Sequence, residues 1–305
     1  MTPLIARLAA PLRIAVLGRD GVGRGTVAAA LTGSGATVIP DRAADVRVVV
    51  VAESLKPEDR ALLAAADRPT VTVLNKADLT GLGDGGPLIR AHRRAADFRA
   101  ATGVPTVPMV ALLATAGLDQ ELLSALRVLV REPADLTSTD AFMCTGHTLR
   151  PEVRRRLLAT LDRFGIARAV LALAEGADDA TVSTVLRLAS QVDRVIEHIE
   201  VAGTPVRYRR IRSVITELHA LSVQSGDERL AAFLSTDETV LATMAAAVEV
   251  VEAAGVMVDR GDDASAHLRR AVQWRRYSRG PVDALHSRCG TDIARGSLRL
   301  LGRVG

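Results

Sequence analysis

A glycine-rich stretch near the start of the chain, GRDGVGRGT at residues 18–26, carries residue types that suit phosphate binding. It follows an apolar run and precedes an Ala-rich segment, which predicts a loop between a strand and a helix. Glycines let backbone N–H groups turn inward around phosphate oxygens, and a helix N-terminus adds positive potential. The expected phosphate contacts are Gly18, Asp20, Gly21, Val22, Gly23, Arg24, Gly25 and Thr26.

This loop departs at two positions from the usual pattern G-x-x-x-x-G-K-[ST]. Arg24 stands where the pattern has lysine, and a planar guanidinium is not equivalent to an ammonium group in a tight site. Gly25 stands where the pattern has the hydroxyl that ligates Mg²⁺, and Thr26 lies one residue late. Taken alone, the loop is also compatible with a strand-to-helix turn that binds no ligand.

A second motif, Asn75-Lys76-Ala77-Asp78, ends the apolar run PTVTVL. N-K-x-D at a strand end resembles the guanine-specificity element of the Ras-like and Era-like GTPases. The resemblance implies that the aspartate accepts hydrogen bonds from the N1–H and the exocyclic amino group of guanine, which adenine does not offer. The lysine stem can lie along the base, and the asparagine can tether the phosphate loop. The chain has two lysines beside 37 arginines, so a lysine at this position adds support. The alternative is an ordinary polar loop after a strand.

The two motifs lie about 50 residues apart, and residues 1–133 resemble a P-loop GTPase domain of the Era- and dynamin-related (translation-factor) class. The stretches DVRVVVVAESLKPEDRALLAAADRPTVTVLNKADL and VPTVPMVALLATAGLDQELLSAL carry this resemblance. It implies a GTP or GDP ligand, with guanine held by Asn75, Lys76, Asp78, Ala111 and Leu112. The C-terminal region resembles, more loosely, the helical regions of bacterial dynamin-like proteins, through VLRLASQVDRVIEHI.

The catalytic parts that this class needs are reduced in the sequence. The stretch TGSGATVIPDRAAD, residues 32–45, has room for one strand and two turns, but not for two switch segments. Asp41 stands at the position of the D-x-x-G aspartate, and Ala44 replaces its glycine. Thr26 and Asp41 are the remaining candidates for a Mg²⁺ ligand, and we do not expect a catalytic residue. Hydrolysis should be negligible, because phosphoryl transfer depends on Mg²⁺ and positioned charge.

Strand and helix patterns alternate in the first part of the chain, which predicts an α/β fold with a reduced, GTPase-like parallel sheet. We expect the α/β domain at 1–133, a linker at 134–150 and an all-α domain of five to seven helices at 151–305. The expected strands are 12–17, 36–39, 46–52, 70–74 and 104–110. The expected helices are 26–31, 57–66, 86–102 and 118–130, followed by a run from Pro151 and by 178–201, 207–224, 236–254 and 263–277.

Composition and residue spacing limit the cellular location, the metal sites and the kinds of partner that we expect. No targeting signal and no membrane-length apolar run is evident, so we expect a cytoplasmic protein, with attachment to the inner membrane face as an option. Cys144 and His147 form a C-x-x-H pair without a second pair, so no zinc site is expected. The basic segment 264–305, which contains Trp274, suits either an anionic membrane surface or a solvated helix with a buried tryptophan. Because only 2% of residues are aromatic, no nucleic-acid partner is expected.

Three functions remain open from sequence. The first is a pseudo-GTPase that binds guanine nucleotide weakly or not at all and acts in assembly or regulation, by pairing with a related GTPase as a homodimer or heterodimer. The second is an active GTPase that uses Arg24 and Thr26 as substitutes. The third is a helical interaction protein whose N-terminal fold is only a scaffold. Nucleotide binding separates the first from the third, and Mg²⁺-dependent turnover separates the second.

Overall fold

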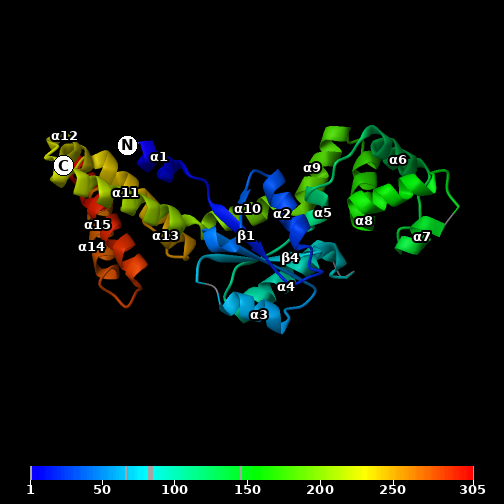
Figure 1. Cartoon of the computed structure of the whole chain (residues 1–305), viewed down its shortest axis with the longest axis horizontal. Coiled ribbons are helices and arrows are strands. Elements are labelled where there is room, and N and C mark those ends of the chain that lie inside the picture. The colour runs from blue at the N-terminus through cyan, green and yellow to red at the C-terminus, as the bar shows by residue number, and fades with distance from the viewer. Residues whose placement is uncertain (1, 66, 82–84, 145, 305) are drawn as a thin grey trace. The chain divides into compact units, whose positions relative to one another are not determined.

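The chain divides into two compact units in the computed structural model, which describes residues 2–65, 67–81, 85–144 and 146–304 (Figure 1). One unit is Leu12–Ile199, and the other combines Met1–Pro11 with Glu200–Gly305. Both units depart from the boundaries expected from sequence. The first unit continues through the expected linker, and the residues before Leu12 belong to the second unit.

A five-stranded, fully parallel sheet forms the centre of the first unit. Its order is β2-β1-β3-β4-β5. The strands are β1 (Arg13–Leu17), β2 (Thr37–Val38), β3 (Val46–Ala52), β4 (Thr70–Asn75) and β5 (Thr106–Pro108). The valine runs of β3 and β4 are almost entirely buried, as expected for strands covered on both faces. The structure therefore confirms the α/β class and the parallel sheet.

Helices cover both faces of this sheet (Figure 1). On one face, α3 (Pro57–Ala64) and α4 (Gly86–Thr102) bury Leu63 and Phe98 against Val49, Val51 and Leu74 of the central strands. Helix α2 (Arg24–Gly33) lies on the other face and buries Val27, Ala30 and Leu31. Burial of each such side chain stabilises the fold by about 1.5–3 kcal/mol.

The short strand β2 places the segment between α2 and β3 at one edge of the sheet. It pairs with only Arg13 and Ile14 at the start of β1, and Ile14 is also the partner of Val46 at the start of β3. The intervening residues pass through a 3₁₀ turn, η1 (Asp41–Ala43), and Asp45 closes on Arg13 through both backbone and side chain. This segment therefore stays at the amino edge of the sheet.

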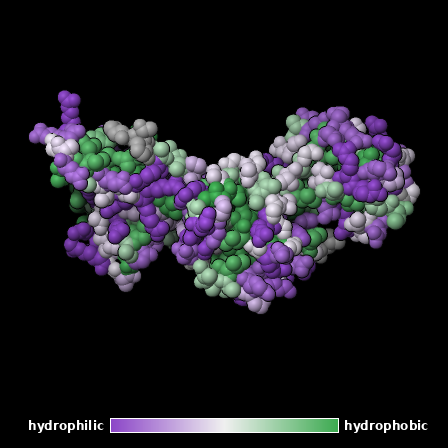
Figure 2. Space-filling view, in the orientation of Figure 1, coloured by the Kyte–Doolittle hydropathy of each residue, from purple (hydrophilic) through white to green (hydrophobic). Residues whose placement is uncertain are grey.

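The rest of the first unit is helical: α5 (Ala111–Ala114), α6 (Gln120–Arg131), α7 (Thr139–Cys144), α8 (Pro151–Ala174), α9 (Asp179–Ser190) and most of α10 (Val192–Ala202), whose residues from Glu200 on are assigned to the second unit. Phe142 of α7 and Leu157 and Leu161 of α8 share one core with Val110 and Leu113, which follow β5. This shared core is the reason that 134–150 does not separate two units. The surface over α6, α7 and α8 is largely hydrophilic on the face shown in Figure 2.

The second unit consists of α1 (Thr2–Ala9), α11 (Thr204–Ser225), α12 (Glu228–Leu234), α13 (Asp237–Ala253), α14 (Ala264–Tyr277) and α15 (Ala284–Val304). Helix α1 packs on α11, where Arg7 forms an ion pair with Glu217 at 2.8 Å. Trp274 is 1% exposed and stacks edge-on with Tyr277. Trp274 is therefore a core residue, as the interpretation of segment 264–305 as a solvated helix with a buried tryptophan expects.

No single helix in the described part of the chain is both long enough and apolar enough to span a membrane. Only α12 and α13 together, bent by 43° at the break between them, reach the length and composition of a membrane span.

Candidate functional site

The carboxyl edge of the sheet brings the two sequence motifs together. The strand order reverses at β1, with the chain going first to β2 on one side and then to β3 on the other. In doubly wound α/β folds, ligands bind outside the carboxyl ends of the strands at such a switch point. The glycine-rich loop follows β1 there, and at the same edge Asn75 ends β4 and residues 76–78 follow it.

The glycine-rich loop has the backbone conformation that an anion-binding turn requires. Gly21 and Gly23 both have φ of 83°, and Gly23 is the left-handed residue immediately before α2. At Gly18 an added Cβ would lie 2.6 Å from the carbonyl oxygen of Val50, so the loop packs directly on β3. The first N–H groups of α2 have no partner within the helix and carry its positive end.

Two arginines of the loop are turned back onto protein atoms. The guanidinium of Arg24 donates to the carbonyl oxygen of Gly18 at 3.2 Å. Arg19 donates to the carbonyl oxygen of Ala52 at 3.2 Å and to the carboxylate of Asp59 at 3.3 Å. Asp59 is fully buried and also accepts from the backbone N–H of Lys56 at 3.0 Å. This aspartate, which the sequence analysis did not single out, therefore fixes the loop to the start of α3.

The Asn-Lys pair holds the loop from the other side. Asn75 is 4% exposed, and its Nδ2 donates to the carbonyl oxygen of Val22 at 2.9 Å. Its Oδ1 accepts from the backbone N–H of Ala111 at 3.1 Å. Lys76 Nζ donates to the carbonyl oxygen of Gly21 at 2.8 Å. Three segments far apart in sequence are thus joined by two adjacent side chains.

A cleft of about 290 Å³ lies where these segments meet. Seven of the residues expected at the site line it: Gly23, Thr26, Asn75, Lys76, Asp78, Ala111 and Leu112. Leu79, Val110 and Asp162 complete the lining. The other loop residues do not line it: Val22 is fully buried, Asp20 is exposed, and Gly25 has open space around its Cβ position.

Two carboxylates face this cleft. Burial raises the pKa of the Asp78 carboxyl above its ordinary value, and the negative charge of Asp162 adds to the rise. Lys76 and Arg163 act in the opposite direction. Asp162 belongs to α8, far along the chain from the two motifs, and it is part of neither of them. Its non-helical backbone, with φ 52° and ψ 178°, interrupts that helix.

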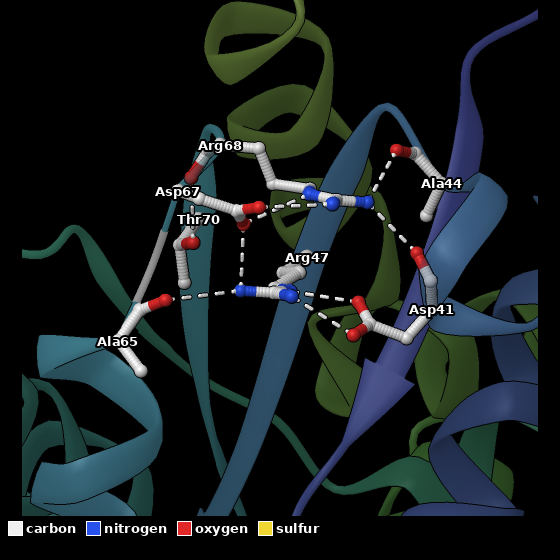
Figure 3. A network of polar contacts seen from close by, with 7 residues as sticks. All are labelled: Asp41, Ala44, Arg47, Ala65, Asp67, Arg68 and Thr70. Atoms are coloured by element: carbon white, nitrogen blue, oxygen red, sulfur yellow. Dashed lines mark hydrogen bonds and ion pairs between the residues drawn. The ribbon is translucent and has the colours of Figure 1, made fainter.

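Asp41 is not part of this site. Its carboxylate pairs with Arg47 Nε at 2.7 Å, at the start of β3, and Arg68 donates to the Asp41 and Ala44 carbonyl oxygens (Figure 3). Asp67 completes the network. The network lies at the amino edge of the sheet, because the short β2 returns the chain there. The expectation of Asp41 as a Mg²⁺ ligand is therefore wrong in this structure.

Among the described residues, no three His, Cys, Asp or Glu side chains come together in a way that could hold a metal ion. His147 Nε2 lies 2.8 Å from the carbonyl oxygen of Glu132, and its Nδ1 accepts from the N–H of Leu149 at 3.0 Å. Both ring nitrogens are thus engaged without Cys144, which is exposed.

Three comparisons with known proteins were negative. No family model, curated protein or solved structure matches the chain. The function of the cleft is therefore inferred from its own residues.

Proposed function

We propose that the chain is a guanine-nucleotide-binding protein with negligible hydrolysis, built on a reduced P-loop GTPase-like domain. The observation that carries the proposal is the shared cleft: Thr26 of the phosphate loop, Asp78 of the base-recognition motif and Ala111 after β5 line the same cavity. In this arrangement the carboxylate of Asp78 accepts from the N1–H and the amino group of guanine. The backbone N–H groups at the start of α2 receive the phosphates.

Low turnover follows from what surrounds the phosphate loop. Gly25 offers no oxygen to Mg²⁺, and Arg24 is hydrogen-bonded to Gly18. The segment between α2 and β3, which would have to supply the switch contacts, lies at the amino edge of the sheet. Phosphoryl transfer relies on Mg²⁺ and on charges positioned around the γ-phosphate. A site with neither holds a nucleotide without consuming it.

A nucleotide-binding domain without turnover suits a role in assembly or regulation. We propose pairing with a related GTPase, or with a second copy of this chain, as the form of that role. An anionic membrane surface is the alternative partner for the arginine-rich α14 and α15.

The experiment that tests the proposal is a titration of purified protein with GDP, GTP and ADP, with turnover of GTP followed in parallel. Guanine nucleotides should bind more tightly than ADP, and Asp78→Ala should remove the difference. A GTP turnover above about 0.1 per minute that Asp78→Ala abolishes would contradict the proposal of negligible hydrolysis.

A further inference from the structure

Asp162 occupies a place in the cleft that nothing in the two sequence motifs accounts for. It lines the same cavity as Asp78 and Ala111, although it comes from the middle of α8 (Pro151–Ala174). A residue inside a helix with φ 52° and ψ 178° adopts a backbone conformation that is essentially confined to glycine. Such conformations persist only where the surrounding structure imposes them, and they concentrate at functional sites.

The packing of α8 explains how Asp162 reaches the cleft. At Gly165, three residues later, an added Cβ would lie 2.4 Å from Cδ2 of Leu113 in α5. Leu161 is fully buried in the same core. Arg163 donates to the carbonyl oxygens of Leu136 and Thr137, which holds the other side of the break. Helix α8 is therefore pressed against the segment that follows β5, and Asp162 is placed at the cavity.

The two oxygens of the Asp162 carboxylate differ in the hydrogen bonds that they accept from the described residues. Oδ1 accepts from the backbone N–H of Arg163 at 2.6 Å. Among the described residues, no hydrogen bond to Oδ2 is found. A carboxylate oxygen at a cavity wall accepts hydrogen bonds only, so a ligand there must bring a donor.

We propose that Asp162 is a specificity-determining residue that accepts a hydrogen bond from the exocyclic amino group of guanine; this inference rests on the proposed function. Guanine brings three N–H donors to this edge, one on N1 and two on the amino group. The Asp78 carboxylate pairs with N1–H and one amino hydrogen, which leaves the second amino hydrogen for Asp162. Two carboxylates in one cleft also disfavour a phosphate at that end, so the base and not the phosphates lies between them.

The test compares GDP with inosine diphosphate, which lacks only the exocyclic amino group. Asp162→Asn keeps the size of the side chain and an oxygen for the N–H of Arg163, so the break in α8 is retained. We expect this variant to bind GDP about tenfold more weakly, the loss of one charge-assisted hydrogen bond, and to bind inosine diphosphate as the wild type does. Asp97→Asn, on the exposed face of α4, removes one charge away from the cleft and should change neither affinity.

The outcomes separate the two proposals. If GDP and inosine diphosphate weaken equally in Asp162→Asn, or if neither changes, the carboxylate does not read the amino group and the assignment of Asp162 is overturned. If in addition Asp78→Ala abolishes GDP binding, the proposed function stands without a role for Asp162. If the wild-type protein binds no guanine nucleotide at millimolar concentration, both proposals fail. A structural role of Asp162 alone would change the stability of the variant and leave the ratio of the two affinities unchanged.

Discussion

Gly23 and Asn75 pack so closely that a Cβ on the glycine would lie 2.4 Å from Nδ2 of the asparagine. The same Nδ2 donates to the carbonyl oxygen of Val22. The left-handed φ of 83° at Gly23 turns the loop into the start of α2. One glycine therefore meets two demands at once, the turn and the contact with Asn75.

This relationship predicts that Gly23→Ala destabilises the first unit. An alanine pays about 1–2 kcal/mol for the left-handed conformation and also displaces Asn75, so we expect the free energy of unfolding to fall by about 2 kcal/mol or more. Gly25→Ala is the matched control, because no atom lies within 4 Å of its added Cβ and its φ is not positive. That variant should be unchanged or more stable by up to about 1 kcal/mol. Urea unfolding of both variants measures the difference, and equal stabilities would refute the close packing.

A second prediction concerns the side-chain amide of Asn75. Asn75→Ala leaves the carbonyl oxygen of Val22 and the N–H of Ala111 without these partners, which should cost about 1–3 kcal/mol for each group that stays buried. Thr72→Val, also on β4, is the control: the Thr72 hydroxyl is buried with no hydrogen-bond partner among the described residues. Its replacement should be neutral or stabilising. Similar losses in the two variants would show that burial, and not the hydrogen bonds, sets the cost.

The substituted loop predicts a gain of function. The double variant Arg24→Lys, Gly25→Ser restores the lysine and the hydroxyl of the usual pattern, and the space around Gly25 admits the new side chain. We expect Mg²⁺ to leave GDP affinity unchanged in the wild type and to raise it about tenfold in the double variant, as one added metal contact would. GTP turnover should stay negligible, because the residues between α2 and β3 remain at the amino edge. Mg²⁺-dependent binding in the wild type would contradict this account of the loop.

Asp78 and Asp41 predict opposite pH dependences of stability. The pKa of Asp78 is raised, chiefly by burial, so between its ordinary and its raised pKa this group binds more proton in the folded protein than in the unfolded chain. This group therefore lowers stability as pH rises through and above its ordinary value of 3.8, and Asp78→Asn should be more stable than wild type at pH 7.

The pKa of Asp41 is lowered, chiefly by its hydrogen bond with Arg47. Its contribution is present above 3.8 and is lost as pH falls through the lowered value, so Asp41→Asn should be less stable than wild type at pH 7. Thermal unfolding of both variants between pH 3 and pH 7 checks the two signs. A shift of the same sign at pH 7 would contradict the electrostatic assignments.

Much of the fold could be predicted because its strongest elements are periodic or continuously apolar. The valine run 46–52 is β3 as expected, and the helix expected at 86–102 is α4. Other boundaries depended on contacts that a pattern does not contain. The run 178–201 is two helices, because Gln191 adopts the left-handed conformation between α9 and α10.

Helix α15 is not among the helices expected from sequence. Its Gly290 and Gly296 are positions where α15 packs closely on α14 and α13. A Cβ at Gly296 would lie 2.4 Å from the sulfur of Met244 in α13. At both glycines, close packing between helices outweighs the low helix propensity of glycine.

The candidate site divides in the same way. Asn75, Lys76 and Asp78 could be singled out by their types and their place at the end of a strand, and the structure brings them to one cleft with Gly23 and Thr26 of the glycine-rich loop. Asp41 was misplaced because the sequence does not show that β2 pairs only with the start of β1, on whose other side β3 begins. Asp162 could not be found from sequence because its position depends on the packing of α8 on α5, which lies about 50 residues earlier in the chain.

We infer that the cleft between the glycine-rich loop and Asp78 holds a guanine nucleotide without Mg²⁺-dependent chemistry. The most direct measurement is a titration of fluorescent GDP against the purified chain, with and without Mg²⁺, on wild type and Asp78→Ala. Binding that is lost in Asp78→Ala and indifferent to Mg²⁺ is the predicted result. No binding by the wild type up to millimolar GDP would contradict the claim and leave the glycine-rich loop as a turn between β1 and α2.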